Sequence, residues 1–203
     1  MSIRKLVRGI DMPPKAKFTR EEIIQAALNI VRESGIESLS ARTLGAKLNS
    51  SARPIFTVFQ NMEEVQQAVL NAARSKYNEY TLKGLSQNPA FKGTGEQYIQ
   101  FAKDEPKLFQ LLFMSEKFDS MTVDSRLALD DYYAEIISSI QTQYGVSKDI
   151  ANRLYRHLWI YTHGIATLIA TRVCIFTNEE IDTMLTETFI GIFKKIMSDE
   201  KGA

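Results

Sequence analysis

The stretch from Ser40 to Phe59, SARTLGAKLNSSARPIFTVF, most constrains how this chain can fold. Its apolar residues recur at helical spacing on both sides of a short polar segment, which predicts two short helices with their inner faces turned toward one core. These inner faces comprise Leu44, Leu48, Ile55, Phe56 and Phe59. With the second helix beginning at Ala52, the pattern is typical of a helix-turn-helix unit.

The polar turn between these helices is Asn49-Ser50-Ser51. Asparagine tolerates the left-handed backbone conformation that ends many helices, so Asn49 is expected to end the first helix. A serine hydroxyl can accept a hydrogen bond from the first turn of a helix, so Ser51 is expected to cap the second.

Capping signals place two longer helices around this unit. Thr19 with Glu22 forms a capping box, and the helix that it opens ends at Ser34-Gly35. Asn61 with Glu64 repeats the arrangement at the head of a long helix, and Ser40 caps the helix between them. The buried positions expected in the first and the long helix are Ile23, Ala27, Ile30, Val31, Val65, Ala68, Val69, Ala72 and Tyr77.

The remaining sequence predicts further helices and no strands, so the expected fold class is all-α. Leu85 to Gly95, which holds Asn88-Pro89 and two glycines, is the expected loop. The helices expected after it are 96–104, 106–114, 123–144, 148–173 and 178–198. Sustained two-residue alternation and internal repeats are both missing from the sequence.

Charge is distributed unevenly along the 203 residues. Residues 1–60 contain ten Lys or Arg and five Asp or Glu, a net charge of +5, while the whole chain carries +1. The remainder therefore carries −4. A basic head on an acidic body is the layout expected when one end meets the phosphates of DNA.

Composition excludes several other classes of protein. One cysteine, Cys174, cannot build a disulfide framework or a cysteine cluster for zinc, and a reducing cytoplasm is the expected compartment. The chain has no apolar run near the roughly 20 residues that span a bilayer, so we expect no membrane association. His157 and His163 point to different sides of one helix, and no nucleophile has a nearby base. We therefore expect neither enzyme activity, nor a metal site, nor a cofactor.

The N-terminal 65 residues resemble the tetracycline-repressor (TetR) family of bacterial transcription regulators. The resemblance rests on the capped first helix ending at Ser34-Gly35 and on LSARTLGAKLNSSARPIFTVFQNMEEV from Leu39 to Val65. It covers about a third of the chain. Weaker similarity lies in PKLFQLLF, Pro106 to Phe113, and in WIYTHG, Trp159 to Gly164.

This resemblance implies a DNA-binding surface on the head. The residues expected there are Lys17, Ser40, Arg42, Ser51, Ala52, Arg53, Pro54, Phe56 and Thr57. Arg53 either reads a guanine edge in the major groove or only meets phosphate. Lys5, Arg8, Lys15 and Lys17 in the basic arm, residues 1–17, either contact DNA or remain disordered.

Four positions depart from the family pattern. Asn49 stands where the family usually has Gly, Pro54 where it often has Thr, Phe56 where it usually has Tyr, and Met62 where it usually has Lys. The tyrosine hydroxyl and the lysine both contact phosphate in the family, so two common contacts are missing here. Each lost contact weakens binding and flattens its salt dependence.

The resemblance also implies an effector pocket in the body. Aromatic residues at helical spacing usually fill a core, yet tyrosines and a tryptophan with polar tips also line apolar pockets. The residues expected to bind ligand are Phe109, Phe113, Tyr133, Trp159 and His163, and His163 could instead bond a partner in the core.

The last two helices carry more apolar residues than their own packing needs, which indicates a homodimer through a four-helix interface. The expected interface residues are Ile165, Leu168, Ile169, Phe189, Ile192, Phe193 and Ile196. The expected domains are a basic arm over 1–17, a DNA-binding head over 18–62, and a ligand-binding and dimerisation body over 63–203.

Taken together, these patterns predict a regulator that a small apolar effector releases from a palindromic DNA operator. The alternative is a helical ligand-binding or interaction protein whose head has lost useful DNA affinity. Phe56 and Met62, which replace two phosphate-contacting residues of the family, favour this alternative.

Overall fold

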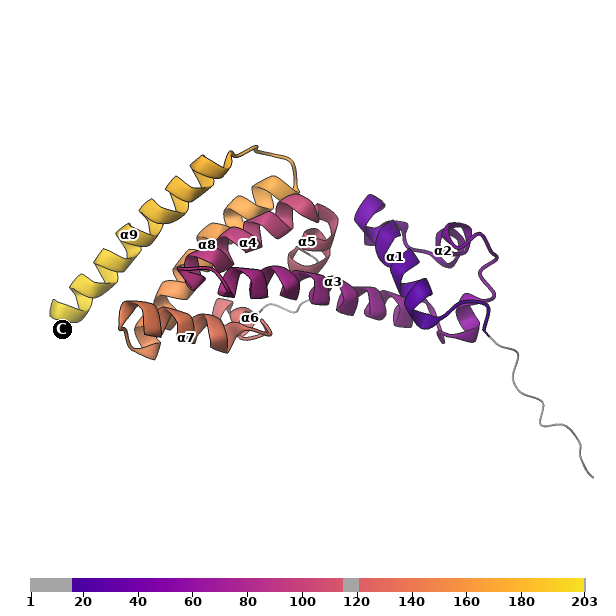
Figure 1. Ribbon diagram of the computed structural model, residues 1–203. Coiled ribbons are helices and arrows are strands. Elements are labelled where there is room, and N and C mark those ends of the chain that lie inside the picture. The colour runs from indigo at the N-terminus through magenta and orange to yellow at the C-terminus, as the bar shows by residue number, and fades with distance from the viewer. Residues whose placement is uncertain (1–15, 115–120, 203) are drawn as a thin grey trace, which may run out of the picture.

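The computed structural model describes residues 16–114 and 121–202, and over these residues the fold is all-α, as predicted (Figure 1). Of the candidate residues in the basic arm, Lys5, Arg8 and Lys15 lie outside the described part, and Lys17 lies within it. In chain order the elements are α1 (Arg20–Ser34), η1 (Ile36–Ser38), α2 (Ala41–Lys47), η2 (Ile55–Thr57), α3 (Met62–Leu85), α4 (Ala90–Asp104), α5 (Pro106–Phe113), α6 (Val123–Leu127), α7 (Tyr133–Tyr144), α8 (Lys148–Ala170) and α9 (Asn178–Gly202), where η marks a 3₁₀ helix.

The caps predicted for α1 and α2 are confirmed. The Glu22 N–H donates to Thr19 Oγ1 at 3.1 Å, and the Thr19 N–H donates to Glu22 Oε2 at 2.8 Å. Gly35 ends α1 with a φ of 84°. At α2, Thr43 completes the capping box with Ser40. The buried face predicted for α1 is also confirmed.

The second half of the helix-turn-helix prediction is wrong. The 3₁₀ helix η2 replaces an α-helix from Ala52, and Phe56 is 44% exposed rather than on the inner face. No side chain caps η2, so the role predicted for Ser51 is also wrong. Proline disfavours α conformation in the residue before it, so Pro54 disfavours an α-helix that starts at Ala52. The first backbone bonds after the turn instead join residues three apart, from the Ile55 N–H to the Ala52 oxygen at 3.1 Å and from the Phe56 N–H to the Arg53 oxygen at 3.2 Å.

Other details of this motif agree with the sequence. Asn49 has a φ of 49°, the left-handed conformation predicted for the end of α2. Ile55 and Phe59 are buried, with exposures of 0% and 1%. They anchor the η2 segment to the core of the head.

The long helix α3 joins the head to the body (Figure 1). The Glu64 N–H donates to Asn61 Oδ1 at 2.8 Å, which confirms the cap. Glu64 accepts its return bond from Gln60 rather than from Asn61, so the box is not reciprocal. The buried alanine in this part of α3 is Ala73 rather than the expected Ala72.

The loop predicted over Leu85 to Gly95 is shorter than expected, because α4 already begins at Ala90. Gly93 lies in α4 at a close crossing with Gly84 of α3. A Cβ atom on Gly84 would lie 2.6 Å from the Thr94 Cα, and one on Gly93 would lie 2.5 Å from the Gly84 carbonyl oxygen. These glycines therefore permit helix packing instead of forming a loop.

The helix predicted over 123–144 is interrupted between α6 and α7. The Tyr132 N–H donates to Asp130 Oδ1 at 2.9 Å. From α3, Tyr77 donates to Asp130 and Asn78 donates to Asp131, each at 2.8 Å. The two hydrogen bonds from α3 stabilise the non-helical segment between α6 and α7. Sequence periodicity could not predict this segment, because it reports only local spacing.

Candidate functional site

Apart from Lys17, which precedes α1, the candidate DNA-binding residues run from the N-cap of α2 through the turn to η2, at the end of the head that points away from the body (Figure 1). The exposed members are Lys17, Ser40, Arg42, Ser51, Arg53, Phe56 and Thr57, and the partly exposed members are Ala52 and Pro54. The structure therefore brings these sequence candidates together on an accessible surface.

The cations of the head fall into two groups. Arg20 pairs with Glu64 at 2.8 Å and lies over the Phe59 ring, and Lys47 pairs with Glu33 at 2.8 Å. Within the described part of the chain, neither Arg42 nor Arg53 has an acidic partner. Their positive charge is available to an anionic partner.

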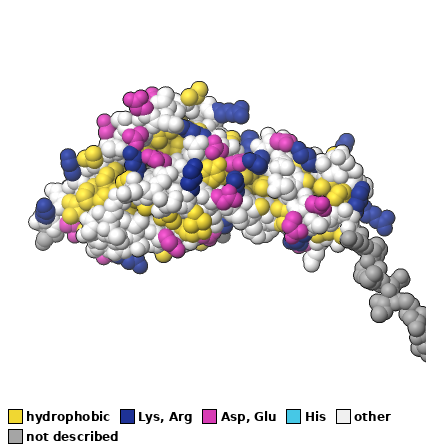
Figure 2. Space-filling view, viewed as in Figure 1, with side chains coloured by type: hydrophobic (Ala, Val, Ile, Leu, Met, Phe, Trp, Pro, Cys, Tyr) yellow, Lys and Arg dark blue, Asp and Glu magenta, His cyan; other side chains and the backbone are white. Residues whose placement is uncertain are grey.

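Lys17 lies beside this surface. Its Nζ donates to Ser50 Oγ at 3.0 Å, which holds the last described part of the arm against the turn. Lys and Arg side chains are visible at the outer end of the head in Figure 2. The arm therefore enters the head next to the candidate contacts.

Gly45 fixes the distance between α2 and the segment that leads to η2. A Cβ atom at this position would lie 3.1 Å from both the Ala52 nitrogen and the Ser50 oxygen. Such contacts are tight, so the small residue lets the backbone of the turn lie directly on α2.

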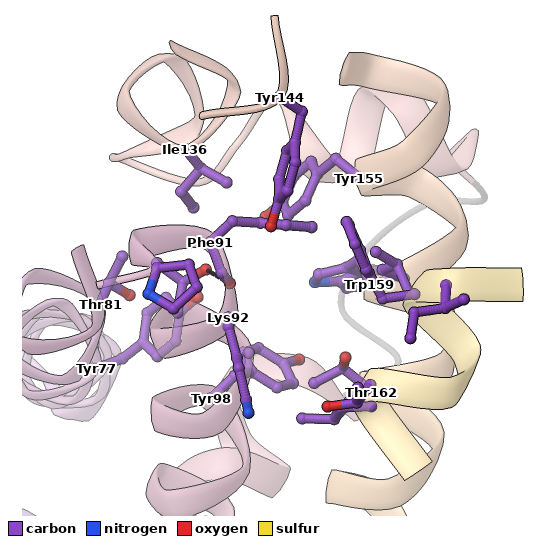
Figure 3. Close-up of a pocket in the computed structure, with 18 residues that line it drawn as sticks. Tyr77, Thr81, Phe91, Lys92, Tyr98, Ile136, Tyr144, Tyr155, Trp159 and Thr162 are labelled. Carbon is purple, nitrogen blue, oxygen red and sulfur yellow. Dashed lines mark hydrogen bonds between the residues drawn. The ribbon is translucent and has the colours of Figure 1, made fainter. Parts of the chain in front are cut away.

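The body contains a cavity of about 400 Å³ between α3, α4, α7, α8 and α9 (Figure 3). This volume is in the range of ligand cavities, roughly 300–1,000 Å³. The aromatic residues in its wall are Tyr77, Phe91, Tyr98, Tyr144, Tyr155, Trp159 and Phe189, and the threonines are Thr81, Thr94, Thr162 and Thr186.

The buried tyrosines of the wall are neutral hydrogen-bonding groups. Burial raises the pKa of Tyr77, Tyr98 and Tyr155 above the usual value of 10. Tyr77 donates to Asp130, whose own pKa burial also raises. The hydroxyls of Tyr144 and Tyr155 have no hydrogen-bond partner among the described residues, so both can bond a ligand.

His163 lies directly behind the wall. Its ring stacks on Trp159, with centroids 5.0 Å apart and planes at 12°, and its Nδ1 is 2.9 Å from the Tyr98 hydroxyl. Burial, followed by the positive charge of Arg126, lowers the pKa of His163 below 6.5. A neutral imidazole therefore supports both rings at neutral pH.

Of the five residues that the sequence analysis placed at the ligand, Trp159 alone lines this cavity. Phe109 is fully buried, 5.8 Å from the His163 ring. Phe113 packs against Arg126, and Tyr133 donates to Asn152 at 2.9 Å.

Six aromatic residues of the cavity wall were not predicted to bind ligand, namely Tyr77, Phe91, Tyr98, Tyr144, Tyr155 and Phe189. Phe91 was assigned to the predicted loop, whereas it lies in the first turn of α4. The sequence signal that could have found it is Pro89, which commonly precedes a helix.

The expected dimer residues have different environments within one chain. Ile165 and Ile196 are buried, with exposures of 3% and 2%, while Leu168 is 36% exposed. Phe189 lines the cavity and stacks on Phe193, with centroids 5.5 Å apart. Ile169 and Ile192 are partly exposed.

Among the described residues, no group of three or more His, Cys, Asp or Glu could hold a metal ion. None of the helices in that part of the chain is both long and apolar enough to cross a membrane.

The chain is similar to the HTH-type nicotine-responsive transcriptional repressor HdnoR of Paenarthrobacter nicotinovorans. The two are 35% identical over 49 residues, which are 24% of this chain and 25% of that repressor. The match thus spans about a quarter of the length of that curated relative. No protein-family model matches the chain.

Proposed function

We propose that this protein is a transcription regulator of the tetracycline-repressor type, a homodimer that binds an operator through its head and a small effector through its body. The observation that carries the proposal is the outer surface of the head, where Arg42 and Arg53 are exposed and have no acidic partner among the described residues. Free guanidinium groups on a helix-turn-helix element are suited to phosphates and guanine edges.

The similarity over 49 residues to a protein named as an HTH-type transcriptional repressor supports this proposal. We assign residues 18–62 to DNA binding and 63–203 to ligand binding and dimerisation. The arm, residues 1–17, would add phosphate contacts through its lysines and arginines.

Helix α3 supports the link between the two activities. It begins at Met62 beside the head, and its inner face reaches the cavity at Tyr77 and Thr81. A ligand that fits better with α3 displaced would favour one arrangement of the heads over another. A coupling of about 1–3 kcal/mol, roughly 5- to 150-fold in DNA affinity, is ordinary for such linkage.

An apolar face on α8 and α9 supports the homodimer. Ile160 and Leu168, eight residues apart on α8, are 49% and 36% exposed, and on α9 Ile190, which also lines the cavity, is 43% exposed. Between the first two lies Gly164, where a Cβ atom would meet nothing within 4 Å. A second copy could approach closely along this face.

The test is a mobility-shift assay with the DNA that flanks the gene, against random DNA as competitor. We expect Arg53→Ala to weaken the specific complex more than the random one, and Arg42→Ala to weaken both. Equal losses on both DNAs for Arg53→Ala would show that Arg53 contacts phosphate alone.

The second candidate function is a ligand-binding protein without useful DNA affinity. It is favoured by the single 3₁₀ turn at η2 and by Phe56, which has no hydroxyl for phosphate. The same assay decides between the two, because this candidate predicts no specific shift with any DNA from the neighbourhood of the gene.

A further inference from the structure

Lys92 is the one charged side chain in the cavity wall within the part of the chain that the structure describes. It lies in the first turn of α4, and Figure 3 shows its side chain beside Tyr98. Its Nζ pairs with Asp182 of α9 and is 3.8 Å from Glu96 Oε1. The hydrogen bond to Asp182 raises the pKa of Lys92, so the ammonium group is charged at neutral pH.

The ion pair that holds Lys92 is open to exchange. The side chains of Lys92 and Asp182 are 37% and 53% exposed, and that of Glu96 is 36% exposed. Ion pairs with this much solvent contact contribute little to stability. A ligand anion can therefore replace Asp182 at small cost.

The rest of the wall selects against other charges. Among the described residues, no carboxylate lines the cavity, so a cationic ligand would find no anionic group in the wall to pair with. A neutral ligand would leave the Lys92–Asp182 pair in place and make no use of the charge. An anion would take over the charge-assisted hydrogen bond that Lys92 now gives to Asp182, while its apolar part fills the cavity.

We propose that the cavity binds an aromatic organic acid, with its ring system among Phe91, Tyr155 and Trp159 and its anionic group on Lys92 in place of Asp182. This inference rests on the proposed effector site and names the class of its ligand. The wall offers edge and face contacts to a planar ring system.

The test uses two fluorescent probes with one ring skeleton. The first, 8-anilino-1-naphthalenesulfonate, carries an anionic group, and N-phenyl-1-naphthylamine is its neutral counterpart. Both are titrated into the purified full-length protein without DNA. Energy transfer from Trp159, the single tryptophan, reports binding in this cavity.

We expect Lys92→Met to weaken binding of the anionic probe about tenfold, a difference of about 1.4 kcal/mol in binding free energy. The neutral probe should bind both proteins equally, and it also shows that the variant is folded. Lys92→Arg should restore the affinity for the anionic probe. Asp182→Asn should increase that affinity, because the competing carboxylate is gone.

Equal effects of Lys92→Met on both probes would overturn the inference and leave the effector site in place. Failure of both probes to bind the wild-type protein would overturn the inference and the effector site together. The DNA-binding part of the proposed function is measured separately by the mobility shift, so each failure is distinguishable.

Discussion

Arg32 on α1 binds both carboxylate oxygens of Glu105, the residue between α4 and α5. Its Nε donates to Glu105 Oε2 at 2.7 Å, and its Nη2 donates to Oε1. Glu105 is 5% exposed, whereas the Arg32 side chain is 44% exposed. This bidentate pair joins the head to the body at a point away from α3, so α3 is not their sole connection.

Removal of this pair should lower stability. Arg32→Ala leaves a buried carboxylate without its partner, and we expect a loss of about 1–3 kcal/mol in the free energy of unfolding. Because the guanidinium is partly in water, the lower half of this range is the better expectation. Urea denaturation of the wild type and the variant measures the difference.

Lys47→Ala is the matched control, because it removes the exposed Lys47–Glu33 pair of the same head. Its expected cost is about 0–1 kcal/mol. Equal costs for the two variants would contradict a structural role for Glu105 in joining head and body.

The crossing of α3 and α4 gives a second prediction. Gly84→Ala places a Cβ atom 2.6 Å from the Thr94 Cα, a backbone atom that cannot rotate away. We expect a loss of about 1–3 kcal/mol, the usual cost of overpacking. Thermal unfolding followed by circular dichroism measures it.

Gly95→Ala provides the comparison within α4. Its Cβ atom would approach only Thr162 Oγ1, at 3.9 Å, which is ordinary contact. Alanine also favours a helix over glycine by about 0.8–1.0 kcal/mol, so this variant should be neutral or more stable. A Gly84→Ala protein as stable as the Gly95→Ala protein would refute the close crossing.

The crossing of α3 and α4 also shows which features of the fold could not be predicted from the sequence. The helix starts at Thr19, Ser40 and Asn61 could be predicted because each cap is a bond between residues three apart. The crossing at Gly84 joins two helices, and a glycine pattern alone does not distinguish close packing from a loop.

The same limit applies to the candidate sites. Apart from Lys17, the DNA-binding candidates came from one contiguous motif, and they lie together on one exposed surface. The cavity wall combines five helices, so no local pattern could select Tyr144 or Phe189 for it. The prediction for Phe56 failed for a different reason. Its burial was inferred from the spacing of an α-helix, whereas the segment after Pro54 is a 3₁₀ helix.

The apolar face of α8 gives a third prediction. Ile160→Asp puts a charge at the centre of the proposed dimer interface, and we expect monomers that no longer shift the operator. Sedimentation at micromolar concentration measures the assembly. Phe193 is a poorer choice, since it packs against Tyr144 and Phe189 inside one chain.

Leu82→Asp controls for the loss of an exposed apolar residue, because Leu82 is 48% exposed on α3. It should remain a dimer. Wild-type protein that sediments as a monomer at micromolar concentration would refute the interface itself.

The stack of His163 on Trp159 gives a prediction for pH. Burial holds the pKa of His163 below 6.5, so below this pH the unfolded chain binds a proton that the folded chain does not. Stability therefore rises with pH in this window and falls as the pH drops below about 6.5, with a slope of at most about 1.4 kcal/mol per pH unit. Urea denaturation at several pH values between 7.5 and 5 measures the slope.

Trp159 reports the same protonation directly, since it is the single tryptophan and lies 5.0 Å from the imidazole. A charged imidazole ring in stacking contact should quench its fluorescence, with a midpoint below pH 6.5 in the folded protein. His163→Gln should abolish this transition and flatten the pH dependence of stability, while His157→Gln controls for loss of a histidine on the exposed side of the same helix. A transition that survives in His163→Gln would place its source elsewhere and contradict the role of His163 behind the cavity wall.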